Sequence, residues 1–580
     1  MRMHRQASSQ GGTPGADGAR RHYRRPRQRP FTREERDRVT LLFGSLSRAH
    51  DRLLTASVQG IGYNAEAIPL PSRPDLQTGR ELCNTGQCNP VYFVAGALIN
   101  HLDRRCAERG ISREQAVSDY VFVTPGSCGP CRFGMYEAEY RQALEKAGFE
   151  GFRVIAFDKK GGGDGHPAEA QGDGLETNLG LYLAVIDALL VADVLNATFY
   201  RARPYATDPE AVSRTFEACL ETCEAALREP RPTPRTGPGT RAIHALLPLQ
   251  RPEDTGHLLA RLRDDRCLRA LEQCRALIEA GLEVDYLRPR PLVKVTGEFW
   301  AQTTEGDGNF RMFDFLEREG AEVQVEPVAG WVDYMRHGLH WQLDERRIAE
   351  RPRIRGTLRR LARALGDRLR HRLIDLAGAL LHREYTRLRR ALGGVAPPLA
   401  DQRTLERLGR PYYNPRITGG EGHLEVAKTL YYHRYRRAHM TLSLKPFGCM
   451  PSTQSDGAQA AVLADHPEIR FLAVETAGEG EINAYSRVQM ALGEVRDLAR
   501  RELDEALERN GTSLETARRY VAERPGLRSP LYPIPYHPEA ISRSARLVHH
   551  IAGELAREGS DAPGAGAASA SAEASHGESR

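Results

Sequence analysis

Apolar runs of strand length alternate with helical patterns along much of the chain. The stretch VTLLFGSLSRAHDRLLTASVQGIGYNAEAIPL begins with an apolar run, continues with apolar residues at helical spacing and ends in a second strand-like run. The stretch DYVFVTPGSCGPCRFGMYEAEYRQALEKAGFEGFRVIAFD repeats the order strand, loop, helix and strand. Strands that alternate with helices at this spacing predict βαβ units and a mostly parallel sheet.

A second run of the same kind follows a Pro- and Arg-rich linker, REPRPTPRTGPGTRA. Here VKVTGEF, AEVQVEP, MTLSLKP and IRFLAVET are the predicted strands. We therefore expect an α/β fold with two parallel-sheet domains and helical insertions. The expected segments are a disordered basic tail (1–34), a first α/β domain (35–245), a second α/β domain (246–500) with a solvated helical insertion (343–392), a C-terminal helical segment (501–557) and a disordered tail (558–580).

The longest apolar run, LGLYLAVIDALLVADVLNATFY, spans residues 179–200 and contains Asp187 and Asp193 near its middle. Two central carboxylates are too costly in lipid, so the run predicts a buried helix and no membrane partner.

Charge adds little about the folded part. The net charge is +6, but residues 1–34 alone hold nine arginines and two acidic residues, so the other residues are close to neutral. We expect a solvated tail and no nucleic-acid binding by the folded part. No apolar segment typical of a secretory signal follows the arginines, which predicts a cytoplasmic protein. Its ten cysteines then favour metal, cluster or catalytic roles over structural disulfides.

The cysteines fall into two groups. One group lies on helical patterns and is expected to be small and apolar: Cys106, Cys219, Cys223, Cys267 and Cys274. The other lies in Gly- and Pro-rich loops: Cys83 and Cys88 in ELCNTGQCNP, Cys128 and Cys131 in PGSCGPC, and Cys449 in KPFGCMPS. Because ligands collect at the carboxyl ends of strands in open α/β sheets, we expect these loops to converge.

Three kinds of cysteine chemistry fit such loops: a redox disulfide, a structural zinc site and an iron–sulfur cluster. A redox disulfide needs only Cys128 and Cys131, and leaves the other loops unexplained. Structural zinc prefers two tight Cys-x-x-Cys pairs, and only one is present. An iron–sulfur cluster accepts ligands from separate loops and has a modest lead on spacing alone.

The chain resembles the 2-hydroxyacyl-CoA dehydratase superfamily, and is most similar to the branch labelled CoA-substrate-specific enzyme activase-related. The resemblance extends over residues 35 to about 490 and rests on these segments in order: VTLLFGSLSRAHDRLL, GYNAEAIP, CNTGQCNPVYF, SCGPCRFGMYEAEY, VKVTGEFW, GGEGHLEVAKT, KPFGCMPSTQSDG and FLAVETAGEGEINAYSRVQ. CGPCRFG and FGCMPS are the most specific of them.

The resemblance implies two Rossmann-like (flavodoxin-like) halves with a [4Fe–4S] cluster between them, or a larger double-cubane cluster. It implies Cys88, Cys131 and Cys449 as the ligands, with Cys128 and Cys83 as secondary ones. It also implies a low-potential electron from an ATP-dependent activase of the actin/Hsp70-like fold, radical dehydration of an acyl-CoA and paired subunits. The activase's own Asp-x-Gly-x-Thr loop does not open this chain, so the chain resembles the electron acceptor.

No catalytic residue follows from the sequence; His423, after a Gly-rich turn, and Glu475, at a strand end, are weak candidates that fit structural roles equally well. Three other functions remain open. They are a cluster-dependent reductase of a small molecule, a non-catalytic electron-transfer or scaffold protein, and a thiol–disulfide protein without metal.

Overall fold

The computed structural model describes residues 28–126, 131–157, 172–231, 237–244, 251–350, 357–417 and 419–560. Cys128 and the ends of both predicted tails, 1–27 and 561–580, lie outside this part of the chain.

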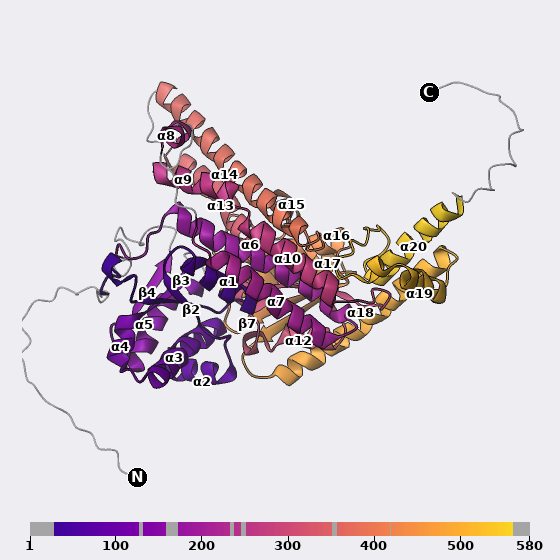
Figure 1. Ribbon diagram of the computed structural model, residues 1–580, viewed down its shortest axis with the longest axis horizontal. Helices are drawn as coiled ribbons and strands as arrows, with labels where there is room; N and C mark the ends of the chain where they lie inside the picture. The colour runs from indigo at the N-terminus through magenta and orange to yellow at the C-terminus, as the bar shows by residue number, and fades with distance from the viewer. Residues whose placement is uncertain are drawn as a thin grey trace, which may run out of the picture.

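Two four-stranded parallel sheets form the framework, as the alternation of strands and helices predicts (Figure 1). The first has the order β2–β1–β3–β4, from β1 (Thr40–Phe43), β2 (Asn64–Ala67), β3 (Tyr120–Pro125) and β4 (Arg153–Phe157). The second has the order β6–β5–β7–β8, from β5 (Leu292–Gly297), β6 (Glu322–Gln324), β7 (Met440–Pro446) and β8 (Phe471–Thr476). In each sheet the order in which strands are added changes side between the two central strands, which are β1 and β3 in the first sheet and β5 and β7 in the second. Ligands of open α/β sheets bind beyond such a switch point.

Helices around the first sheet come from the N-terminal part of the chain, drawn in indigo in Figure 1. They are α1 (Arg48–Gln59), α2 (Arg73–Leu82), α3 (Asn89–Arg109), α4 (Arg113–Asp119) and α5 (Tyr136–Lys146). Two glycines bring α2 and α3 into backbone contact. A Cβ on Gly79 would lie 1.8 Å from the Tyr92 carbonyl oxygen, and one on Gly96 would lie 1.7 Å from that of Asp75. The connection between these helices carries Cys83 and Cys88.

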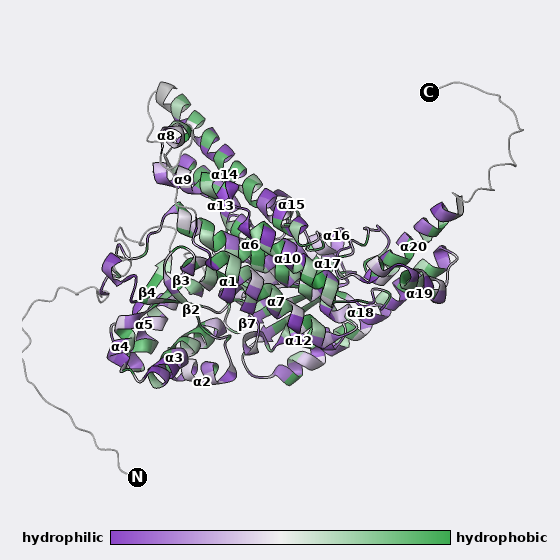
Figure 2. Ribbon diagram, in the orientation of Figure 1, coloured by the Kyte–Doolittle hydropathy of each residue, from purple (hydrophilic) through white to green (hydrophobic). Residues whose placement is uncertain are grey.

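Helices rich in apolar residues fill the centre of the molecule, where Figure 2 shows hydrophobic residues concentrated on α6 and α10. They are α6 (Leu179–Ala202), α7 (Pro209–Arg228) and α10 (Arg266–Gly281), whereas α8 (Pro238–His244) and α9 (Pro252–Arg263) lie at the edge in Figure 1. Leu179–Tyr205 is long and apolar enough to cross a membrane, but 72% of its most apolar window is buried inside the protein. The predicted buried helix is therefore confirmed.

The two carboxylates of α6 are fully paired within the protein. Asp187 forms ion pairs with Arg231 at 2.8 Å and Arg261 at 2.6 Å. Asp193 accepts hydrogen bonds from the backbone N–H groups of Val328 at 2.7 Å and Ala329 at 2.8 Å. Buried charges of this kind are tolerated because their partners replace water.

The second sheet is surrounded by the rest of the chain: α11 (Phe299–Thr303), α12 (Met312–Arg318), α15 (Gln402–Gly409), α16 (Gly422–Arg434), α17 (Met450–Asp465), α18 (Glu481–Arg509), α19 (Leu514–Glu523) and α20 (Arg543–Ser560). The expected helical insertion is a hairpin that begins earlier than residue 343. It consists of α13 (Val328–Glu350) and α14 (Thr357–Ala391), which project from the body in Figure 1.

Two expected boundaries differ in the structure. Residues 28–34 belong to the folded body, because Phe31 is buried and its carbonyl oxygen accepts a 2.8 Å hydrogen bond from Gly174. The Thr32–Glu35 capping box is present there, at the start of a short 3₁₀ helix (Arg33–Glu35). At the other end, α18 runs through the expected boundary at residue 500.

Candidate functional site

The two halves of the molecule meet at Asn89, the first residue of α3. Its backbone N–H donates to the Phe447 carbonyl oxygen at 3.1 Å, and its Nδ2 donates to the Thr476 carbonyl oxygen at 3.1 Å. Phe447 follows β7, and Thr476 ends β8. These hydrogen bonds bring Cys88, the residue before α3, to the carboxyl edge of the second sheet.

Cys449 lies on the other side of this contact, immediately before α17. Gly448 has φ +77°, and a Cβ there would lie 3.3 Å from the Gln87 carbonyl oxygen and 3.5 Å from Cys88 Cα. Only glycine adopts this conformation readily in so little space. The loops that carry Cys88 and Cys449 are therefore in direct backbone contact.

Cys131 approaches from the end of β3. It precedes a 3₁₀ turn (Arg132–Met135) that leads into α5, and Arg132 hydrogen-bonds to the Gly86 carbonyl oxygen in the Cys88 loop. The Cys131 thiol lies close enough to the Cys88 thiol for the charge of Cys88 to contribute to its raised pKa. The structure thus brings together Cys88, Cys131 and Cys449, whereas Cys128 lies outside the described residues.

Two buried carboxyl groups, Glu298 and Glu421, lie near the three cysteines. Glu298 follows β5 and accepts a 2.9 Å hydrogen bond from the Ala301 N–H. Glu421 precedes α16 and accepts a 2.9 Å hydrogen bond from Trp331 Nε1. Burial, and then the charge of Glu421, raises the pKa of Glu298 to about 8. Burial also raises the pKa of Glu421.

Sequence reasoning missed both carboxyl groups. The predicted strand VKVTGEF includes Glu298, whereas β5 ends one residue before it, so its position at a strand end was not recognised. Glu421 follows a Gly-Gly turn and not a strand, so the sequence does not place it at the carboxyl edge of a sheet, where ligands bind.

The three thiols are held away from water. Burial raises the pKa of Cys88 to about 11 and that of Cys131 to about 12, and it also raises the pKa of Cys449. The charges of Glu298 and Glu421 add to the increase for Cys131 and Cys449. Thiols in this environment stay neutral unless a cation takes up the negative charge of the thiolate.

A bound metal centre would supply that charge. Among the described residues, no group of three Cys, His, Asp or Glu side chains is arranged to hold a metal ion. Soft thiolates from separate loops are the ligands that iron–sulfur clusters take.

The secondary and weak candidates lie elsewhere. Cys83 is buried at the end of α2, and the charges that act on its thiol are those of Glu139 and Lys146. His423 is buried on α16 and packs against Gly409, where an added Cβ would lie only 2.9 Å from His423 Nε2. Glu475 is exposed on β8, in register with Lys445.

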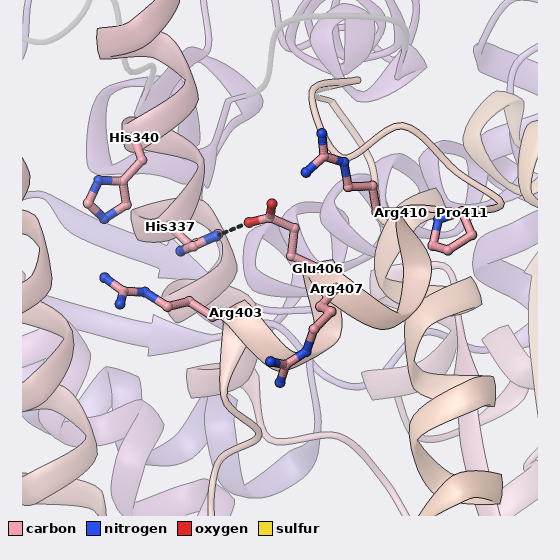
Figure 3. Close-up of a pocket in the computed structure, with 7 residues that line it drawn as sticks. All are labelled: His337, His340, Arg403, Glu406, Arg407, Arg410 and Pro411. Carbon is pink, nitrogen blue, oxygen red and sulfur yellow. Dashed lines mark hydrogen bonds and ion pairs between the residues drawn. The ribbon is translucent and has the colours of Figure 1, made fainter.

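A cavity of about 690 Å³ lies away from the cysteines, between α13 and α15. Figure 3 shows its lining of histidine and arginine side chains, with no cysteine among them. It is therefore a separate feature from the group of three cysteines.

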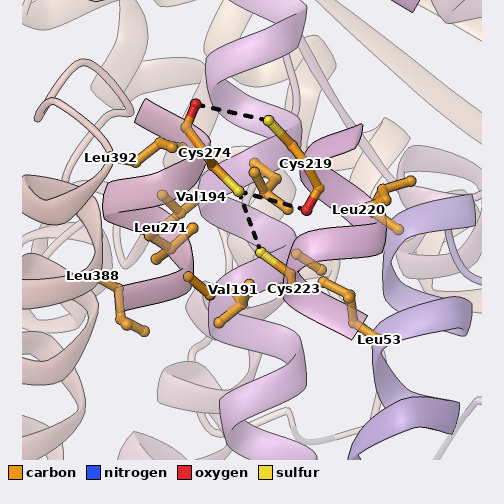
Figure 4. Packing of buried hydrophobic residues seen from close by; sticks show 14 of the residues in the cluster. Leu53, Val191, Val194, Cys219, Leu220, Cys223, Leu271, Cys274, Leu388 and Leu392 are labelled. Atoms are coloured by element: carbon orange, nitrogen blue, oxygen red, sulfur yellow. Dashed lines mark hydrogen bonds between the residues drawn. The ribbon is translucent and has the colours of Figure 1, made fainter. Parts of the chain in front are cut away.

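Four of the five cysteines on helical patterns are core residues, as predicted (Figure 4). Cys219, Cys223 and Cys274 pack among leucines and valines between α7 and α10, and Cys223 Sγ lies 3.6 Å from Cys274 Sγ. Cys267 is buried in the same cluster, whereas Cys106 is only half-buried.

No family model matches this chain, and neither a curated protein nor a solved structure shows significant similarity to it.

Proposed function

We propose that this protein is an iron–sulfur protein whose cluster is held by Cys88, Cys131 and Cys449. One observation carries the proposal: three free cysteines from three separate loops meet at the switch points of two parallel sheets, with Cys88 and Cys449 buried and Cys131 half-buried. Cys128 would be the fourth ligand of a closed [4Fe–4S] cluster, and its absence from the ligand set would leave one iron open to substrate. The role of the protein is to accept low-potential electrons from an ATP-dependent activase of the actin/Hsp70-like fold. These electrons serve radical dehydration or reduction of a substrate of the acyl-CoA class.

The helix ends favour this use of the thiols. Cys88 and Cys449 each precede a long helix, α3 or α17, whose positive end stabilises negative charge. Tyr136 Oη lies 2.9 Å from Cys88 Sγ, and Ser452 Oγ donates to Cys449 Sγ at 3.2 Å. Hydrogen bonds to ligating sulfurs are one of the means by which a protein sets the potential of a cluster.

Glu298 supplies a proton beside the thiols. With a pKa of about 8 it carries its proton at neutral pH, as a general acid must. In a dehydration this proton would leave with the departing hydroxyl group as water, and a cluster held by Cys88, Cys131 and Cys449 would supply the electron and a Lewis-acidic iron. Glu421 keeps the pKa of Glu298 high, because two neighbouring carboxylates resist double ionisation.

The fold and the environment support the finer parts of the proposal. The strand orders β2–β1–β3–β4 and β6–β5–β7–β8 correspond to four of the five strands of the flavodoxin-like order 2-1-3-4-5, which supports Rossmann-like (flavodoxin-like) halves. Free buried thiols suit a reducing compartment, which supports a cytoplasmic location.

Anaerobic purification of the full chain, with iron and sulfide analysis and electron paramagnetic resonance, tests the proposal. We expect iron and sulfide in the wild type, and loss of both in Cys88→Ser, Cys131→Ser and Cys449→Ser. Cys219→Ala and Cys274→Ala, at buried cysteines of the core, are the controls and keep their iron. An iron-free folded protein, or equal iron loss in Cys219→Ala and Cys131→Ser, would refute the proposal.

Product analysis then separates the catalytic alternatives. A protein reduced by activase and ATP that releases water from a 2-hydroxyacyl-CoA is a dehydratase. Net two-electron reduction of a small molecule instead identifies a reductase. A cluster that is reduced but turns over neither substrate class supports an electron-transfer role.

A further inference from the structure

The strongest feature outside the group of three cysteines is the groove between α13 and α15, which the proposed function does not use. Arg403 and Arg407 lie on α15, and Arg410 directly follows it; all three line the groove. His337 and His340 face them from α13 (Figure 3). A concave surface of about 690 Å³ thus has five basic side chains in its lining.

Two of these arginines have no carboxylate partner within the part of the chain that the structure describes. Arg403 donates to both oxygens of Asp375, at 2.9 and 3.0 Å. Arg407 bonds only to Thr404 Oγ1 at 3.2 Å, and no ion pair is formed by Arg410. Both side chains are exposed, and their guanidinium groups extend to opposite sides of Glu406 in Figure 3. A ligand with two anionic groups would offset both positive charges.

The one acid in the lining is already occupied. Glu406 lies between the arginines in sequence, and its Oε2 is 2.8 Å from His337 Nε2. This contact draws the carboxylate toward α13 in Figure 3. The guanidinium groups of Arg407 and Arg410 therefore remain available for a ligand.

An aromatic end adjoins the basic one. A second hollow of about 300 Å³ shares Arg410 and Pro411 with the first and reaches Trp341 and Tyr412. The Arg416 guanidinium carbon lies 5.2 Å from the centre of the Trp341 ring. A planar ring attached to an anionic group would find stacking partners here.

We propose that this groove binds a small diphosphate-bearing ligand through Arg407 and Arg410. Arginine is suited to phosphate because its planar fork of donors matches phosphate oxygens. The volume is that of a small-molecule site, about 300–1,000 Å³. Outside residues 1–34 the chain has almost no net charge, which argues against a nucleic-acid track. The site shares no residue with the group of three cysteines, so its test is independent of iron content.

Titration calorimetry on the full chain, at a constant salt concentration of about 0.15 M, tests the proposal with two probes, inorganic pyrophosphate and ADP. We expect saturable binding by the wild type. Arg407→Gln/Arg410→Gln should weaken it about tenfold or more, because two charge-assisted contacts are lost. The matched control is Arg518→Gln/Arg519→Gln, which removes the same charge from two exposed arginines on α19 and leaves binding unchanged.

The two probes distinguish the sources of the diphosphate group. Tighter binding of ADP identifies a nucleoside diphosphate that reaches the Trp341 end, and equal binding identifies a diphosphate alone; both outcomes support the site. Absence of saturable binding of either probe, or equal affinity in the two double variants, would overturn the proposal.

Discussion

The Tyr136 hydroxyl lies 2.9 Å from Cys88 Sγ, although the two residues are 48 positions apart and belong to different loop–helix units. Burial raises the pKa of Tyr136 well above its ordinary value, so the phenol keeps its proton and would donate to a Cys88 thiolate. Phe133 packs edge-on against the Tyr136 ring, with ring centres 4.9 Å apart. The ring is fixed by packing, and its hydroxyl group is aimed at a proposed ligand.

Tyr136→Phe should retain iron and shift the reduction potential to a more negative value. The hydrogen bond stabilises the extra negative charge of the reduced state, so its loss makes reduction harder. A redox titration monitored by electron paramagnetic resonance measures the shift. Tyr120→Phe is the control, because the Tyr120 hydroxyl has no hydrogen-bond partner among the described residues. An unchanged potential in Tyr136→Phe would show that this hydroxyl does not act on a cluster.

Gly96→Ala should destabilise the protein by about 3 kcal/mol, because the added methyl group would overlap the Asp75 carbonyl oxygen and force α2 from α3. Since the Cys88 loop joins these helices, iron retention should fall as well. Chemical denaturation of iron-free protein measures the first effect separately. The matched control is Gly493→Ala in α18, where nothing lies within 4 Å of the added Cβ and alanine favours the helix. Equal stability of the two variants would contradict the packing argument.

The sequence predicted the parts of the site that are marked by strand ends. Cys131 and Cys449 follow apolar strands closely, and the parallel arrangement places such loops at one edge of each sheet. The sequence around Cys131 and Cys449 does not predict how the two sheets are placed relative to one another. Hydrogen bonds from the Asn89 backbone to Phe447 and from its side chain to Thr476 contribute to that arrangement, and such bonds leave no pattern in the sequence.

The basic groove was hidden for a different reason. Charges on most turns of residues 343–392 indicate a solvated hairpin, and the outer half of α14 fits, with Leu361, Leu365 and Leu369 exposed among its charges. Its inner half is core: Tyr385 and Leu388 are buried against the central helices. Tertiary packing, and not the helical pattern, determines that α13 stands beside α15.

His423→Gln should reduce the decrease in the free energy of unfolding between neutral pH and mild acid. Burial lowers the pKa of His423 to about 4, below its value of about 6.5 in an unfolded chain. Between these values the unfolded state binds more protons, so stability is full above pH 6.5 and falls as the pH drops toward 4. Thermal melts at pH 7 and pH 5 should therefore differ less in His423→Gln than in the wild type. His466→Gln, at a more exposed histidine, is the control. If both variants lose as much stability as the wild type, His423 is not the titrating group.

Glu326→Gln should cost about 3 kcal/mol or more in the free energy of unfolding. Glu326 Oε2 lies 2.8 Å from Lys294 Nζ on β5 and 3.7 Å from Lys428 Nζ on α16, and all three side chains are buried. Both lysines lower the pKa of Glu326 against the effect of burial, so its carboxylate is ionised. Removing that charge leaves two buried ammonium groups that repel one another, with only the weaker attraction of Glu421 on Lys428 to offset this repulsion. Chemical denaturation at pH 7 measures the cost, and Glu508→Gln, on the exposed face of α18, is the control. A cost no larger than that of Glu508→Gln would mean that the lysines are already neutral in the folded protein.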